Sequence, residues 1–91
     1  MSTLEEYLLI LRSKGFHFGE DAIGFIYFGK QYTEASDELI KIAIELTLKV
    51  QKEFDGSFYI SLLETFKTNG IEERKDALAY VISKQLLPFP S

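Results

Sequence analysis

Residues 36–54 of the chain, SDELIKIAIELTLKVQKEF, decide the fold class. Ser36 is a residue type that caps helices, and the acidic Asp37 and Glu38 after it suit the positive end of a helix dipole. The apolar residues that follow recur every three or four positions, at Leu39, Ala43, Leu46, Val50 and Phe54. This spacing predicts one long amphipathic helix with a buried apolar face.

Capping and stop signals on either side predict further helices. A capping-box pattern at the N-terminus predicts a first helix over about residues 3–14. A fourth helix, capped by Ser57, is expected to end at Asn69-Gly70, and a fifth is expected over about residues 72–86. The inner face of the fifth helix is predicted to carry Leu78, Val81, Ile82 and Leu86.

These elements predict an all-α fold, a single compact bundle of four to five short helices. A chain of 91 residues supports one hydrophobic core, so residues 1–91 are expected to form one domain. Residues 87–91 contain both prolines and are predicted to form an extended tail, because proline cannot continue a helix.

Residues 15–32 are the least ordinary segment, because six aromatic rings alternate there with four glycines. The acidic Glu20 and Asp21 favour a short buried helix over about residues 20–30. The aromatic run at residues 22–28 is also typical of a strand, which would make the fold α+β. A lone strand would have no partner, and the helix is therefore preferred.

Composition points to a cytoplasmic protein. The chain has no cysteine, which excludes disulfides and zinc–thiolate sites and suits a reducing compartment. No apolar run approaches the ~20 residues that span a bilayer, and the N-terminus lacks the charge pattern of a signal peptide. The net charge of -4 repels phosphate backbones, so nucleic acid is possible as a partner but not favoured.

The chain also lacks the patterns that indicate an enzyme. His17 is the only histidine, which severely limits metal sites and nucleophile–base pairs. The glycines and lysine between Gly24 and Lys30 have the spacing of a phosphate-binding loop, but bulky residues fill it and Gln31 follows where Ser or Thr would hold magnesium. We therefore expect no catalytic residue, cofactor, metal or small-molecule substrate.

The rings of residues 15–32 are the best candidates for partner binding, because six rings exceed what one short helix buries on a single face. Phe89, between the two prolines of the tail, is a further candidate anchor. The sequence thus predicts a non-enzymatic cytosolic interaction module that binds another protein or its own copy. The predicted partner-binding residues are Phe16, Phe18, Tyr27, Tyr32 and Phe89. The alternative is that these rings build the core.

The pattern from Ser36 to about residue 80 resembles the helical C-terminal domain of the DnaD family, which acts in bacterial and phage replication initiation. Phe58, Leu62 and Phe66, followed by the Gly70-Ile71 turn, fall on that family's aromatic, aliphatic and tryptophan positions. The resemblance implies a replication accessory protein without enzymatic activity, which binds single-stranded DNA or replication proteins. Nucleic-acid contacts would then come from Tyr59, Lys67, Arg74 and Lys75.

Overall fold

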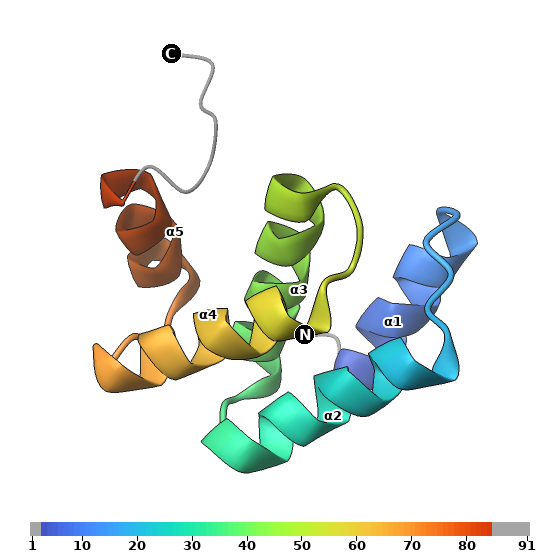
Figure 1. Ribbon diagram of the computed structural model, residues 1–91, viewed down its shortest axis with the longest axis horizontal. Coiled ribbons are helices and arrows are strands. Elements are labelled where there is room, and N and C mark those ends of the chain that lie inside the picture. Colours follow the sequence, from blue (N-terminus) through green and yellow to red (C-terminus); the bar gives the residue numbers. More distant parts are fainter. Residues whose placement is uncertain (1–2, 85–91) are drawn as a thin grey trace.

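The computed structural model describes residues 3–84, which form five α-helices and no strand (Figure 1). The helices are α1 Leu4–Ser13, α2 Glu20–Thr33, α3 Asp37–Gln51, α4 Gly56–Thr68 and α5 Arg74–Ser83. The predicted all-α bundle is therefore confirmed. The alternative strand at residues 22–28 is wrong, because these residues lie within α2 and a strand there would have no partner. The predicted tail at residues 87–91 lies outside the described residues.

Two helices begin at the predicted caps. At α1 the Thr3 hydroxyl accepts a hydrogen bond from the Glu6 amide, and the Glu6 carboxylate accepts one from the Thr3 amide. This reciprocal pair satisfies two amides that have no partner within the helix. At α3 the Ser36 hydroxyl accepts from the Leu39 amide at 3.2 Å. The capping signals therefore placed the starts of α1 and α3 correctly.

The start of α4 lies earlier than predicted. The Asp55 carboxylate accepts from the Phe58 amide at 3.0 Å, so Asp55 is the cap and Ser57 is already helical. Asp and Ser are about equally good caps, and the choice between them depends on the connection that brings α4 against the bundle. The predicted stop at Gly70 is confirmed, since Gly70 has a φ of 67°.

The ends of α2 and α3 carry no glycine signal. Glu34 and Lys52 follow these helices with φ values of 56° and 67°, in the left-handed region that L-residues rarely adopt. At each of these residues the backbone leaves the helical conformation, which ends the helix. A local pattern could not predict either position.

Helix α3 is the centre of the fold and packs against each of the other four helices. Its seven buried residues are Leu39, Ile40, Ile42, Ala43, Ile44, Leu46 and Thr47. The predicted face was too narrow, since residues on both sides of it are also covered. Helix α3 ends before Phe54, which lies in the connection to α4 and packs its ring against Phe18 and Tyr59, at centroid distances of 5.7 and 5.3 Å.

Helices α2 and α4 lie side by side and make a close contact at Gly29 (Figure 1). A Cβ atom at Gly29 would lie 2.8 Å from both Leu63 Cδ1 and Tyr59 Cε2. The Tyr59 hydroxyl completes the contact by donating to the Ile26 carbonyl at 2.8 Å. A side chain at position 29 would therefore force the two helices apart.

Asp37 joins three helices. Its carboxylate accepts from the Leu4 amide of α1 at 3.1 Å and forms an ion pair with Lys30 of α2. The Lys30 ammonium and the Leu4 amide both lower the pKa of the Asp37 carboxyl, in that order. The ends of α1 and α2 are therefore fixed to the first turn of α3.

Helix α5 packs on α3, and its buried residues are Ala77 and Val81. It begins at Arg74, after the two glutamates predicted in its first turn. Ile82, predicted on the inner face, is 50 % exposed, because the buried side of α5 is centred on these two smaller residues. Leu86 lies outside the described residues.

Candidate functional site

Helix α2 buries few of its large side chains. Only Ile26, Gly29 and Thr33, spaced three and four residues apart, are fully covered. Since Gly29 lies in close contact with α4, the rings of α2 lie to either side of this buried line. The rings of residues 15–32 therefore separate into two surfaces on the protein.

We call the first surface the aromatic stripe, formed by Phe25, Phe28 and Tyr32. These side chains are 44, 56 and 56 % exposed and follow one another at three- and four-residue spacing along α2. Phe28 and Tyr32 stack with ring centroids 5.5 Å apart and planes 10° from parallel. The Phe25 ring covers the backbone at Gly56, where a Cβ atom would lie 2.6 Å from it. The stripe therefore runs along the border between α2 and α4.

The second surface is a groove of about 530 Å³ between α1 and α2. It is lined by Glu5, Leu8, Leu9, Arg12, Phe16, His17, Phe18, Ile23 and Tyr27. The Tyr27 hydroxyl spans the groove and donates to the Glu5 carboxylate at 3.0 Å. Hydrogen bonding from the Glu5 backbone and from Tyr27 lowers the pKa of that carboxyl. Arg12 and His17 are exposed in the same groove.

The predicted partner-binding residues divide between these surfaces. Phe16, Phe18 and Tyr27 line the groove, whereas Tyr32 belongs to the stripe. Phe89 lies outside the described residues. Phe25 and Phe28 were not among the predicted residues, although their spacing from Tyr32 is that of one helix face.

Two of the four residues predicted to bind nucleic acid are engaged within the fold, Tyr59 and Arg74. The prediction that Tyr59 contacts nucleic acid is wrong, because its side chain is fully buried and its hydroxyl donates to the Ile26 carbonyl of α2. This burial raises the pKa of the Tyr59 phenol above its usual range. Both terminal nitrogens of Arg74 donate to the Glu45 carboxylate, at 3.1 and 3.0 Å. Lys67 and Lys75 remain as exposed cations on α4 and α5.

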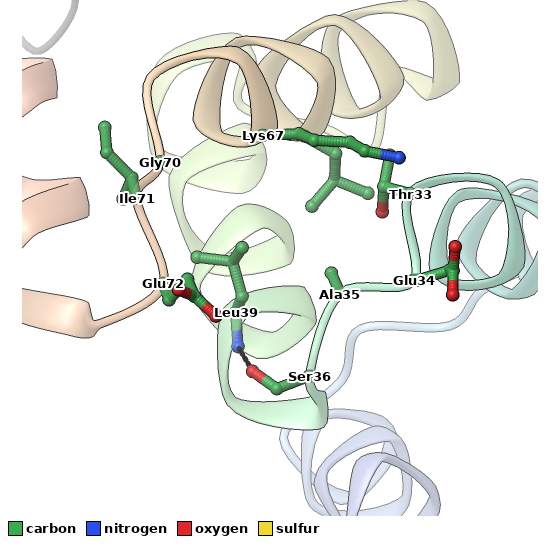
Figure 2. Close-up of a pocket in the computed structure, with 10 residues that line it drawn as sticks. Thr33, Glu34, Ala35, Ser36, Leu39, Lys67, Gly70, Ile71 and Glu72 are labelled. Atoms are coloured by element: carbon green, nitrogen blue, oxygen red, sulfur yellow. Dashed lines mark hydrogen bonds between the residues drawn. The ribbon is translucent and has the colours of Figure 1, made fainter.

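A smaller hollow of about 200 Å³ lies between the α2–α3 and α4–α5 connections (Figure 2). Its two hydroxyl groups already serve the fold: the Thr33 hydroxyl donates to the Gly29 carbonyl, and the Ser36 hydroxyl caps α3. Figure 2 shows Lys67 extended across this hollow toward Thr33. Because these hydroxyls are already used in local hydrogen bonds, the hollow presents no arrangement of nucleophile and base.

Two other kinds of site are absent from residues 3–84. No three histidine or acidic side chains gather there in a way that could hold a metal ion. None of the helices in this range combines the length and apolar character of a bilayer-spanning segment.

Comparison with known families gives a match over most of the chain. A family profile described as a family of unknown function, DUF6123, covers residues 1–87. No curated protein and no solved structure matches the chain. Nothing in these comparisons bears on the resemblance to DnaD, which stays a prediction.

Proposed function

The chain belongs to DUF6123, a family of unknown function, and we propose from its own surface that it is a non-enzymatic protein-interaction module. It acts as an adaptor or regulator, and its contact surface is the aromatic stripe. The absence of cysteine supports the cytoplasm as its location, because it suits a reducing compartment.

The observation that carries this proposal is the exposure of three neighbouring rings on α2. Tyrosine and phenylalanine are enriched in the cores of protein interfaces, where they bury a large area. Phe28 and Tyr32 are already stacked in the free protein, which reduces the side-chain entropy lost on binding. Contiguous exposed rings of this kind mark contact surfaces in soluble proteins.

Gly24 supports a helix as the element that docks on the stripe. It lies one turn before Phe28 within α2, and no atom lies within 4 Å of the position that its Cβ would occupy. Glycine inside a helix costs about 1 kcal/mol relative to alanine, and no contact within residues 3–84 requires glycine here. An exposed glycine beside the rings lets another backbone approach closely.

Site-specific photo-crosslinking tests the proposal. A photoreactive phenylalanine analogue at Phe28 should yield discrete cross-linked species in extracts of the source cell. The same analogue at Lys49, an exposed residue of α3, is the matched control. Equal or absent products at the two positions would rule out the stripe as a contact surface.

A further inference from the structure

We propose that the aromatic stripe binds a second copy of this chain, with the two α2 helices antiparallel and Asp21 of each copy facing Lys67 of the other. This inference rests on the proposed function, because it names the partner of the same surface. Three observations support it: the spacing along the stripe, the charges at its two ends, and the open space beside it.

The spacing of the stripe is the same in both directions. Asp21, Phe25, Phe28 and Tyr32 are separated by four, three and four residues and lie on one side of α2. Two antiparallel copies therefore place Phe25 of one copy opposite Phe28 of the other, and Asp21 opposite Tyr32. This alternation of four and three residues is that of a helix–helix seam, and a twofold axis makes the two halves equivalent.

The charges at the two ends are complementary. Asp21 is exposed at one end of the stripe and has no ion-pair partner within residues 3–84. At the other end a hollow of about 260 Å³ contains Tyr32 and Lys67, and Lys67 likewise has no partner among the described side chains. The antiparallel arrangement brings each Asp21 carboxylate to a tyrosine hydroxyl and a lysine ammonium. Two equivalent charge contacts form in one dimer.

Glu64 lines the same hollow and is the acidic side chain among the described residues there. Its carboxylate repels an approaching Asp21, so it weakens the contact that Lys67 favours. The proposal therefore gives the two residues of α4 opposite effects on association. Neutralising Glu64 should strengthen the dimer, and removing the charge of Lys67 should weaken it.

The exposed area indicates a weak dimer. Three half-exposed rings supply about 300 Å² per copy, whereas a stable interface buries about 800 Å² per partner. Exposed residues of α2 and α4 beside the rings add to this area, and Gly24 permits close approach of the second helix. We expect a reversible dimer that is populated at high micromolar concentrations.

Sedimentation velocity over a range of protein concentrations tests the inference. The weight-average mass of the full chain should rise from one chain toward two as concentration increases. Asp21→Lys and Lys67→Asp should each weaken association about tenfold, since each replaces two attractive contacts by repulsive ones. The double variant that carries both changes exchanges the two charges and should restore association.

Matched variants separate the stripe from the groove. Phe28→Ala should abolish association, while Phe16→Ala, which removes an exposed ring of the groove, should leave it unchanged. Circular dichroism verifies that each variant remains helical. Glu64→Gln should shift the equilibrium toward the dimer.

Several results would overturn the inference. A wild-type chain that stays monomeric at every concentration excludes the second copy. In that case cross-links from Phe28 to a different protein still support the proposed function, so the two failures are distinguishable. Failure of the double charge exchange to restore association would exclude the antiparallel contact of Asp21 with Lys67.

Discussion

Helices α2 and α3 have nearly the same length, 14 and 15 residues, but they relate to the core in opposite ways. Helix α3 buries seven residues and contacts every other helix, whereas α2 buries three, one of which is a glycine. The larger side chains belong to α2, yet most of its rings remain at the surface. Burial therefore follows the position of a helix in the bundle rather than the size of its side chains.

The largest expected effect contrasts a buried aliphatic residue of α3 with an exposed ring of α2. Ile44→Ala removes a fully covered side chain and should lower the free energy of unfolding by about 2–5 kcal/mol. Phe28→Ala should change it by no more than about 0.5 kcal/mol, because the ring is mostly in solvent. Urea denaturation of both variants measures the difference. A large loss for Phe28→Ala would show that the stripe is part of the core.

The contact of α2 with α4 gives the second prediction. Gly29→Ala adds a methyl group 2.8 Å from Tyr59, whose ring cannot move freely because its hydroxyl is bonded to Ile26. We expect a loss of about 1–3 kcal/mol from overpacking, which exceeds the gain of up to about 1 kcal/mol in helix propensity. Thermal or urea unfolding would measure it. A more stable variant would contradict the close packing of the two helices.

Local signals in the sequence were sufficient for much of the fold and insufficient for its contacts. Thr3, Ser36 and Gly70 mark helix ends through their own backbone or side-chain chemistry, so they could be recognised without a structure. The burial of Tyr59 could not, because it depends on where α2 lies over α4 and on the space left by Gly29. Leu62 and Phe66 of the same helix already fit an apolar stripe at helical spacing, so the pattern gives no reason to expect that Tyr59 is buried as well.

The same limit applies to the candidate site. Six rings in residues 15–32 predict surplus aromatic surface, but sequence spacing alone does not say which ring lies on which side of α2. Tyr27 shows this clearly: it was predicted together with Tyr32, but it lies in the groove, where its hydroxyl is bonded to Glu5. Which side of α2 each ring occupies depends on the buried line through Ile26 and Gly29, and the contact of Gly29 with α4 sets the direction of that line.

The ion pair between Lys30 of α2 and Asp37 of α3 gives the third prediction, a stability difference that depends on pH. Asp37→Asn removes the charge that binds Lys30 and weakens the contact with Leu4, so we expect a loss of about 1 kcal/mol at neutral pH. The pKa of the Asp37 carboxyl is lower in the folded protein than in the unfolded chain. Its contribution to the free energy of unfolding is therefore fully present above the unfolded pKa of about 3.9, and it is lost as the pH falls through the lower, folded pKa. Urea denaturation of both proteins at neutral pH and near pH 3 should show the gap narrowing in acid. A gap of constant size would show that the carboxylate charge contributes nothing.

The smallest expected effect has the opposite sign and concerns the second glycine of the same helix. Gly24→Ala places a methyl group in open space within α2, so the folded protein should gain about 0.5–1 kcal/mol from higher helix propensity and a less flexible unfolded chain. Thermal unfolding measures this gain, and Gly29→Ala is the matched comparison. It is the same substitution five residues away, where the added methyl group meets α4. If the second copy docks against this face, the more stable variant should associate less tightly, because the methyl group holds the two α2 helices apart. A gain in stability together with unchanged association would mean that no partner backbone approaches at Gly24. Neither the monomer nor the dimer would then require glycine at this position.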